Sequence, residues 1–321
     1  MKLLIDCDPG VDDALALIIA AADPQADIRA VTTVAGNVNV DICTRNARYV
    51  LDLVGADVPI VSGARAPLHR ELRDASETHG DDGIGNLHAF RLPDGSPKHP
   101  LPHPTPGEDR AVETIIEAIR SDPGNVILVA TGPLTNLARV VEADADALGM
   151  AQRIVIMGGT FRVPGNVTPD AEFNFWCDPE AAAIVVAQPI EKTLVGLDVT
   201  HQVVLDRGFV ETKILALGTP LAEFVRDATD VYARFDSRKY GVRGSYVHDA
   251  VAMVEALHPG SLGLAPMRVR VGDGGECILD DGPPNADVAV SVDESQMLNM
   301  LHGAIASLRY EEGRPCDGAA L

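Results

Sequence analysis

The chain has few basic residues for its length. Its 321 residues include 26 lysines and arginines against 47 aspartates and glutamates, which gives a formal net charge of −21. Proteins that hold nucleic acids or anionic membranes need Lys and Arg in excess along one face, because they bind through phosphate groups. The charge balance therefore argues against nucleic acid and membrane as partners. It is compatible with a small substrate and with a bound cation.

Long apolar runs and paired cysteines are also missing. The apolar run before Asp6 is only three residues long (3–5), whereas a secretory signal needs a run of about 7–15 and a membrane span one of about 18 or more. The five cysteines are scattered and form no CxxC or zinc spacing: Cys7, Cys43, Cys177, Cys277 and Cys316. This pattern is typical of reduced thiols, so we expect a cytoplasmic protein.

Apolar segments alternate along the chain with helical patterns. The expected strands are 3–5, 28–34, 59–61, 126–130, 154–157, 193–197, 267–271 and 286–292. The expected helices are 12–22, 41–54, 110–120, 134–141, 179–187, 220–235, 248–257 and 294–308. Uniformly apolar strands separated by helices predict an α/β fold with a mostly parallel, Rossmann-like sheet flanked by helices. We expect one large domain over 1–310, with a tail at 311–321.

One stretch interrupts this alternation. Residues 63–109 show little periodicity, and six prolines lie within 93–106. A long loop in a compact domain is usually functional or disordered. We therefore expect 65–90 to lie near a site and the proline tract to be a surface excursion.

Acidic residues crowd the end of the first strand. They are Asp6, Asp8, Asp12 and Asp13. Helix capping accounts for one or two of them, and four would repel one another unless a cation compensates. An EF-hand is excluded because Val11 and Leu17 occupy the positions of its glycine and bidentate glutamate. Oxygen ligands alone favour Ca²⁺ or Mg²⁺ over zinc.

Further polar residues follow other predicted strands. Asn37, Thr131, Asn166, Glu172 and Asn174 are such residues, and His248 and Asp249 open a late helix. Each one alone could be a cap or a satisfied loop residue. Ligands of open α/β sheets bind beyond the carboxyl ends of the strands. Amides and carboxylates gathered there suit the hydroxyls of a sugar.

These motifs resemble the nucleoside hydrolases, the inosine–uridine-preferring nucleoside N-ribohydrolase family. The matching segments are DCDPGVDDA (6–14), TGPLTN (131–136), MGG (157–159), GN and AEFN (165–174), DPEA (178–181), LDVT (197–200) and HD (248–249). The resemblance covers about residues 3–305 and implies calcium-dependent hydrolysis of ribonucleosides to free base and ribose. It also implies a role in nucleoside salvage and a homodimer or homotetramer.

The resemblance also assigns roles to residues. One Ca²⁺ per subunit would be held by the carboxylates of Asp8, Asp13 and Asp249 and by the carbonyl of Thr131. The 2′- and 3′-hydroxyls of ribose and a water would complete its shell. Asp8 would be the general base that takes a proton from the attacking water. The ribose would contact Asp12, Asn37, Met157, Asn166, Glu172 and Asn174.

Two histidines match positions around the base. His248 matches the residue that protonates the leaving base in some members, and His79 matches a histidine over the base. The alternative is that either is an ordinary surface histidine. Trp176 is the single tryptophan and is expected to pack in the core, which disfavours stacking of purines between tryptophans. The family often has proline where Ala250 stands.

An aromatic segment near the C-terminal third has two interpretations. Tyr232, Phe235, Tyr240 and Tyr246 could form a lid over the base, although helix packing explains Tyr232 and Phe235 equally well.

Three other functions compete with ribonucleoside hydrolysis. A haloacid-dehalogenase-type phosphatase also begins with a strand and Asp-x-Asp, but Pro9 and Gly10 follow here and the ribose motif has no place in that chemistry. A non-catalytic nucleoside-binding protein could use the same pocket. A third alternative is a hydrolase of another ribosylated compound.

Overall fold

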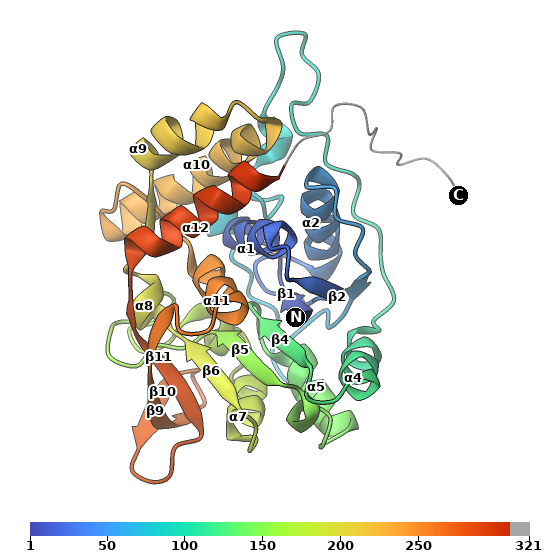
Figure 1. Ribbon diagram of the computed structural model, residues 1–321, viewed down its shortest axis with the longest axis vertical. Helices are drawn as coiled ribbons and strands as arrows, with labels where there is room; N and C mark the ends of the chain where they lie inside the picture. Colours follow the sequence, from blue (N-terminus) through green and yellow to red (C-terminus); the bar gives the residue numbers. More distant parts are fainter. Residues whose placement is uncertain (309–321) are drawn as a thin grey trace.

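The structure of the chain, a computed structural model, describes residues 1–308, so the expected tail at 311–321 lies outside the described residues. A nine-stranded sheet runs through the molecule in the order β10-β9-β11-β6-β5-β4-β1-β2-β3 (Figure 1). Its strands are β1 (Lys2–Cys7), β2 (Asp27–Thr33), β3 (Ile60–Ser62), β4 (Val126–Ala130), β5 (Arg153–Met157), β6 (Lys192–Val195), β9 (Leu262–Val271), β10 (Cys277–Asp280) and β11 (Ala286–Val292). A separate pair joins β7 (Val204–Asp206) to β8 (Gly244–Tyr246).

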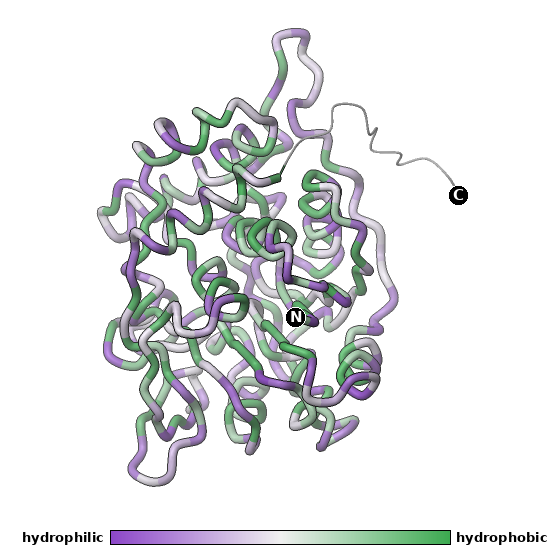
Figure 2. The backbone as a smooth tube through the Cα atoms, viewed as in Figure 1, coloured by the Kyte–Doolittle hydropathy of each residue, from purple (hydrophilic) through white to green (hydrophobic). Residues whose placement is uncertain are grey.

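The strands from β3 to β11 in this order are all parallel, which confirms the predicted α/β class. Every residue of β4 is buried, as expected of a strand covered on both faces, and Figure 2 shows the inner strands as mainly hydrophobic. The outer strands differ from the prediction. β9 is longer than the expected 267–271 and pairs antiparallel with both β11 and β10.

Helices cover both faces of the sheet. They are α1 (Val11–Ala22), α2 (Val40–Leu53), α3 (Ser76–His79), α4 (Ala111–Ser121), α5 (Thr135–Ala143), α6 (Phe173–Cys177), α7 (Pro179–Ala187), α8 (Leu197–Thr200), α9 (Arg207–Phe209), α10 (Pro220–Tyr240), α11 (His248–Leu257) and α12 (Glu294–Ser307). The shorter turns are η1 (Leu87–Ala89), η2 (Leu148–Met150), η3 (Val210–Ile214) and η4 (Leu215–Leu217). One apolar core includes α1, α2, α11 and α12, and the other includes α4, α5 and α7. Within residues 1–308, no helix combines the length and apolar character that a membrane crossing requires.

The chain order places a binding site at the end of β1. The chain leaves β1 toward β2 and β3 on one side, and β4, β5 and β6 continue the sheet on the other. Asp6 pairs with Thr32 of β2 and with Ala130 of β4, so the segments that follow these strands emerge at one edge. Such a switch in strand order is where open α/β sheets bind ligands.

The long loop at 63–109 crosses the outside of the molecule with only α3 and η1 as regular structure. The proline tract is mainly exposed, as predicted for a surface excursion. His99 is the exception, because its ring is buried and its Nε2 lies 2.8 Å from a carboxylate oxygen of Asp227 on α10. Lys98 also pairs with Asp227 at 2.8 Å. These contacts tie the loop to α10.

Candidate active site

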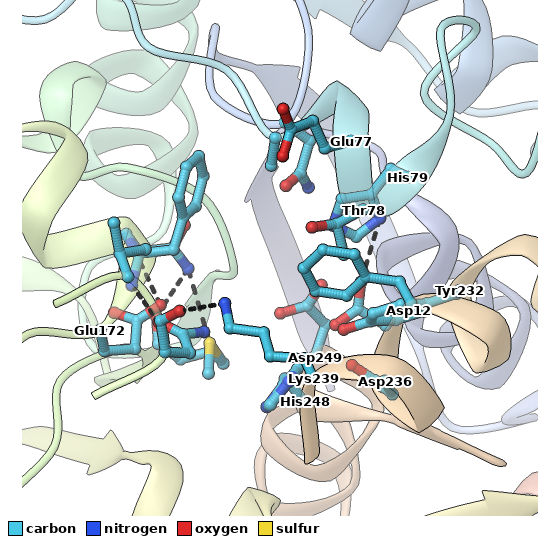
Figure 3. Close-up of a pocket in the computed structure, with 18 of the residues that line it drawn as sticks. Asp12, Glu77, Thr78, His79, Glu172, Tyr232, Asp236, Lys239, His248 and Asp249 are labelled. Atoms are coloured by element: carbon cyan, nitrogen blue, oxygen red, sulfur yellow. Dashed lines mark hydrogen bonds and ion pairs between the residues drawn. The ribbon is translucent and has the colours of Figure 1, made fainter. Parts of the chain in front are cut away.

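A cavity of about 260 Å³ lies at this edge of the sheet. Residues from strand ends, from the 74–79 segment, from α10 and from α11 line it (Figure 3). Ten predicted site residues are among them: Asp12, Asn37, His79, Thr131, Met157, Asn166, Glu172, Asn174, His248 and Asp249. Asp8 and Asp13 are completely buried and do not line the cavity.

Three buried carboxylates converge at one side of the cavity. Asp12 and Asp13 belong to the first turn of α1, and Asp249 belongs to the first turn of α11. One carboxylate oxygen from each lies within 4.8 Å of the others, which is close enough to share a metal ion. Burial, and then the charge of neighbouring aspartates, raises the pKa of Asp12 and Asp249 well above the usual value. A cation would relieve this repulsion.

The residues expected to bind the metal differ from the residues of this carboxylate cluster. The family resemblance implies that Asp12 contacts the ribose and Asp8 the metal, whereas in the structure Asp12 joins Asp13 and Asp249 in the tight cluster. Periodicity on α1 could not separate these roles, because Asp12 and Asp13 are adjacent and both start the helix.

The Asp8 carboxylate is held in a confined position. Its Oδ2 accepts a hydrogen bond from the backbone N–H of Asn37 at 2.7 Å, and its Oδ1 is buried with no hydrogen-bond partner among residues 1–308. A Cβ on Gly36 would lie 2.1 Å from Oδ2, and a Cβ on Gly132 would lie 2.8 Å from Oδ1. Glycine is therefore needed at both positions for the backbone to lie this close to the Asp8 carboxylate. Burial and the nearby Asp13 raise the pKa of Asp8 well above its usual value.

Asp13 ties three segments together. Its Oδ2 accepts from the backbone N–H of Gly10 at 2.9 Å and from the side-chain amide of Asn37 at 3.2 Å. Its Oδ1 accepts from the Thr131 hydroxyl at 2.7 Å. These bonds join α1 to the loops that follow β2 and β4. The Thr131 carbonyl accepts from the side-chain amide of Asn174 at 2.8 Å.

The opposite wall comes from the loop between β5 and α6. Glu172 caps α6, with Oε1 accepting from the backbone N–H of Asn174 at 2.8 Å and Oε2 accepting from Gly159 at 2.9 Å. Burial raises the pKa of Glu172 to about 7. The Asn166 side chain accepts from the backbone N–H of Phe173 at 2.9 Å. The polar side chains of this wall are thus fixed by backbone hydrogen bonds before any ligand enters.

His79 and His248 both line the cavity and are both buried. His79 lies on α3, at a ring-centroid distance of 5.0 Å from Tyr232 on α10. His248 is the first residue of α11, and its Nδ1 shares a hydrogen bond of 2.7 Å with the hydroxyl of Thr200. Burial lowers the pKa of His79 to about 3. Burial, followed by the charges of His201 and His79, lowers that of His248 well below its usual value.

The α10 wall holds residues that the sequence did not identify. Asp236 and Lys239 both line the cavity. Lys239 donates to the backbone carbonyl of Asn166 across the opening (Figure 3). Asp236 accepts from the backbone N–H of Tyr246 at 2.9 Å, and burial raises its pKa to about 7. The sequence feature that could have identified Asp236 is its spacing from Tyr232, because residues four positions apart lie on the same face of a helix.

Aromatic residues also line the cavity. Tyr232, Phe235 and Tyr240 line the cavity from α10. The expectation that Trp176 packs in the core is wrong, because its side chain is partly exposed and lines the cavity. The Arg73 guanidinium lies 5.7 Å from the centre of its ring. Trp176 follows the buried Phe175 on the short helix α6, which turns it toward the cavity rather than the core.

The chain is similar to known proteins both in sequence and in fold. Residues 3–299 match the family model described as inosine-uridine preferring nucleoside hydrolase. The chain is 35% identical over 313 residues to the pyrimidine-specific ribonucleoside hydrolase RihA of Salmonella arizonae, covering 94% of this chain and 97% of that protein. It is 38% identical over 261 residues to the inosine-uridine preferring nucleoside hydrolase of Leishmania major, covering 80% of this chain and 79% of that protein.

A solved structure extends the likeness to three dimensions. The purine-preferring ribonucleoside hydrolase from Gardnerella vaginalis superposes with a TM-score of 0.86 at 30% identity, covering 96% of this chain and 99% of that one. Family match, sequence relatives and fold coincide over nearly the whole chain. The chain therefore belongs to the inosine-uridine preferring nucleoside hydrolase family and is a ribonucleoside hydrolase, acting on the N-glycosidic bond.

Proposed function

We propose that the chain hydrolyses ribonucleosides in a calcium-dependent reaction, with Asp8 as general base and His248 facing the leaving base. The observation that carries the proposal is the buried Asp8 carboxylate, whose Oδ1 has no partner within residues 1–308 although it lies beside Asp13. A buried carboxylate is costly unless it is paired or coordinates a metal. The proposed ligands are Asp8, Asp13, Asp249 and the Thr131 carbonyl.

The residues present fit a hard cation. The available donors are carboxylate and carbonyl oxygens, which is the ligand set of Ca²⁺, and a single cation can neutralise several of the crowded charges. When bound, Ca²⁺ would orient the ribose hydroxyls and make the attacking water more acidic.

The chain's own groups would then act on the substrate. Cleavage of the glycosidic bond builds positive charge on the ribose ring, and a carboxylate-rich cavity stabilises that charge more strongly in the transition state than in the ground state. Asp8 would accept the proton of the attacking water. The ribose would be held by Asp12, Asn37, Met157, Asn166, Glu172 and Asn174, which all line the cavity.

Pyrimidine ribonucleosides are the proposed substrates, alone or within a broader range. The relative from Salmonella arizonae is named pyrimidine-specific, and that from Leishmania major is named inosine-uridine preferring. The base side of the cavity offers His79, His248 and Tyr232, and its single tryptophan cannot form a two-tryptophan stack.

The proposal is tested by measuring free ribose from uridine, cytidine, inosine, adenosine and nicotinamide riboside, with added Ca²⁺ or with a chelator. We expect release from uridine that is lost with the chelator and restored by Ca²⁺. Asp8→Asn should abolish turnover, while Asp281→Asn, at an exposed loop position, should match the wild type. Release from nicotinamide riboside alone would redirect the assignment to another ribosylated compound. Nucleoside binding without release would leave only a binding protein.

We also propose a cytoplasmic homodimer or homotetramer that serves nucleoside salvage. Four cysteines within the described residues are free thiols, which supports a reducing compartment. Leu264, Leu279 and Val290 are exposed on the neighbouring strands β9, β10 and β11, which supports self-association. Light scattering coupled to size-exclusion chromatography gives the assembly mass. A monomer at micromolar concentration would refute the oligomer.

A further inference from the structure

Residues 197–200 form a motif with no role in the site described above, because none of them lines the cavity. They form the short helix α8, which follows β6. Thr200 at the end of α8 is completely buried and lies against His248. Its hydroxyl oxygen is 2.7 Å from Nδ1 of the His248 ring. The contact joins two elements that are 48 positions apart in the sequence.

The direction of this hydrogen bond follows from the needs of the hydroxyl. A hydroxyl has one hydrogen to donate, and a buried hydroxyl without an acceptor costs about 1–3 kcal/mol. Within residues 1–308, the Thr200 hydroxyl forms no hydrogen bond to any other side chain or to the backbone. The need for an acceptor assigns the donor role to the hydroxyl and the acceptor role to Nδ1. The Nδ1 atom then carries no hydrogen, and the hydrogen of the uncharged ring is on Nε2.

The surrounding rings keep His248 in this orientation. The His201 and Tyr246 ring centres lie 5.5 and 5.7 Å from that of His248. Thr200 itself is held by a backbone hydrogen bond from its N–H to the carbonyl of Gly196, at 3.2 Å. Both partners thus belong to regular elements packed beside the cavity.

We propose that Thr200 is a positioning residue for His248: by donating to Nδ1, its hydroxyl fixes the ring so that the Nε2–H is presented to the departing base. The inference rests on the proposed placement of His248 at the leaving base. As the glycosidic bond breaks, its electrons return to the base, and a hydrogen bond from Nε2–H stabilises the negative charge that builds there. Without Thr200, the ring can place its hydrogen on Nδ1 and offer only a lone pair.

The experiment compares two substrates whose leaving groups differ. Uridine has a poor leaving group that needs a donor, whereas p-nitrophenyl riboside leaves as a stable anion. Thr200→Val keeps the shape of the side chain and removes the hydroxyl. We expect kcat for uridine to fall about 10- to 100-fold, because His248 remains and only part of the roughly 10²- to 10⁴-fold worth of a proton donor is lost, while kcat for the aryl riboside changes less than about 3-fold. Thr200→Ser restores the hydroxyl and should recover uridine turnover.

Two further variants separate positioning from packing. Thr229→Val also removes a buried hydroxyl, one that donates to the Val225 carbonyl at 2.7 Å on α10, and it should leave the ratio between the two substrates unchanged. In a His248→Ala background, Thr200→Val should add no further loss with uridine, because both changes remove the same interaction.

The outcomes distinguish this inference from the proposed function. Equal losses with both substrates in Thr200→Val, while His248→Ala still discriminates between them, would overturn the role of Thr200 and leave that of His248 intact. A His248→Ala variant that fails to discriminate would overturn both. Failure of Thr200→Ser to recover uridine turnover would also overturn the inference, because the hydroxyl would then not be the active feature.

Discussion

The backbone N–H of Val11 donates a hydrogen bond of 3.1 Å to Nδ1 of His79. The bond joins the start of α1 to α3 in the long loop, across 68 positions of sequence. Because Nδ1 accepts, the uncharged His79 ring carries its hydrogen on Nε2. A second N–H donor is thereby available at the cavity without a positive charge, and the loop that supplies it is fixed to the edge of the sheet that bears the cavity.

We expect His79 to make the free energy of unfolding depend on pH. Its pKa is about 3 in the folded chain and about 6.5 in the unfolded chain, so between these values the unfolded chain binds the extra proton. Its contribution to stability is present above about pH 6.5 and falls as the pH drops toward 3. His79→Asn keeps an acceptor for Val11 and should remove up to about 1.4 kcal/mol per pH unit from this slope.

Urea unfolding at pH 7, 6, 5 and 4 measures the slope for wild type and variant. His103→Asn, an exposed histidine of the proline tract, is the matched control and should keep the slope of the wild type. A His79→Asn variant with the slope of the wild type would mean that the His79 ring binds its proton as readily in the folded chain as in the unfolded one.

One glycine substitution should lower kcat, whereas another should keep kcat and raise the stability of the fold. A Cβ on Gly36 would lie 2.1 Å from Oδ2 of Asp8, so Gly36→Ala must displace the proposed base. A shift of about 1 Å costs about 100-fold in rate, and we expect at least that loss in kcat. Gly303 lies inside α12 with no atom within 4 Å of an added Cβ, so Gly303→Ala should keep kcat and add about 0.5–1 kcal/mol of stability. Unchanged kcat in Gly36→Ala would show that Asp8 is not the base.

Much of the fold was predictable because its strongest elements are locally encoded. Residues 126–130, 179–187 and 248–257 were predicted with the bounds of β4, α7 and α11. The strand β4 is apolar throughout. The helix α7 follows its capping residue Asp178, and α11 begins at His248. By contrast, β10 is a short, partly exposed edge strand, and within residues 1–308 it pairs with β9 alone, so its sequence carries little hydrophobic pattern.

Residues of the site that follow strands were predictable from the sequence. Residues that a helix from a distant part of the chain brings to the cavity were not. Asn37 and Thr131 were found because strand order brings their segments to one edge. Asp236 and Lys239 reach the cavity only through the packing of α10 against the long loop and against β8, which no local pattern encodes. Asp12 was assigned to the ribose, although its carboxylate gathers with two others in the structure.

Substitutions among the acidic residues separate metal ligands from ribose contacts. We expect Asp13→Asn to weaken Ca²⁺ binding at least 100-fold, since it loses a proposed ligand, and calorimetric titration with Ca²⁺ measures this. Asp12→Asn should keep Ca²⁺ affinity within about 10-fold and raise KM for uridine. A loss of Ca²⁺ affinity in Asp12→Asn as large as in Asp13→Asn would instead make Asp12 a ligand, as its place in the cluster permits.

Calcium binding should also depend on pH. Burial and mutual repulsion raise the pKa of Asp12 and Asp249, so without a cation the folded chain binds protons there that the unfolded chain releases. Their contribution to stability is therefore present at low pH and is lost as the pH rises. Ca²⁺ displaces these protons, so the rise in melting temperature on adding Ca²⁺ should be larger at pH 8 than at pH 6. The opposite order would mean that the cation binds elsewhere.

Lys239 should govern substrate affinity more than turnover. Its ammonium donates to the Asn166 carbonyl and lies 5.1 Å from the Phe235 ring centre, so it links α10 to the ribose-side loop across the opening. Lys239→Met removes this link and should raise KM for uridine about 10- to 150-fold, the worth of one charged hydrogen bond, with kcat nearly unchanged. Arg238→Met changes an exposed neighbour on the same helix and should leave both constants as they are. A fall in kcat without a change in KM would place Lys239 in the chemical step instead.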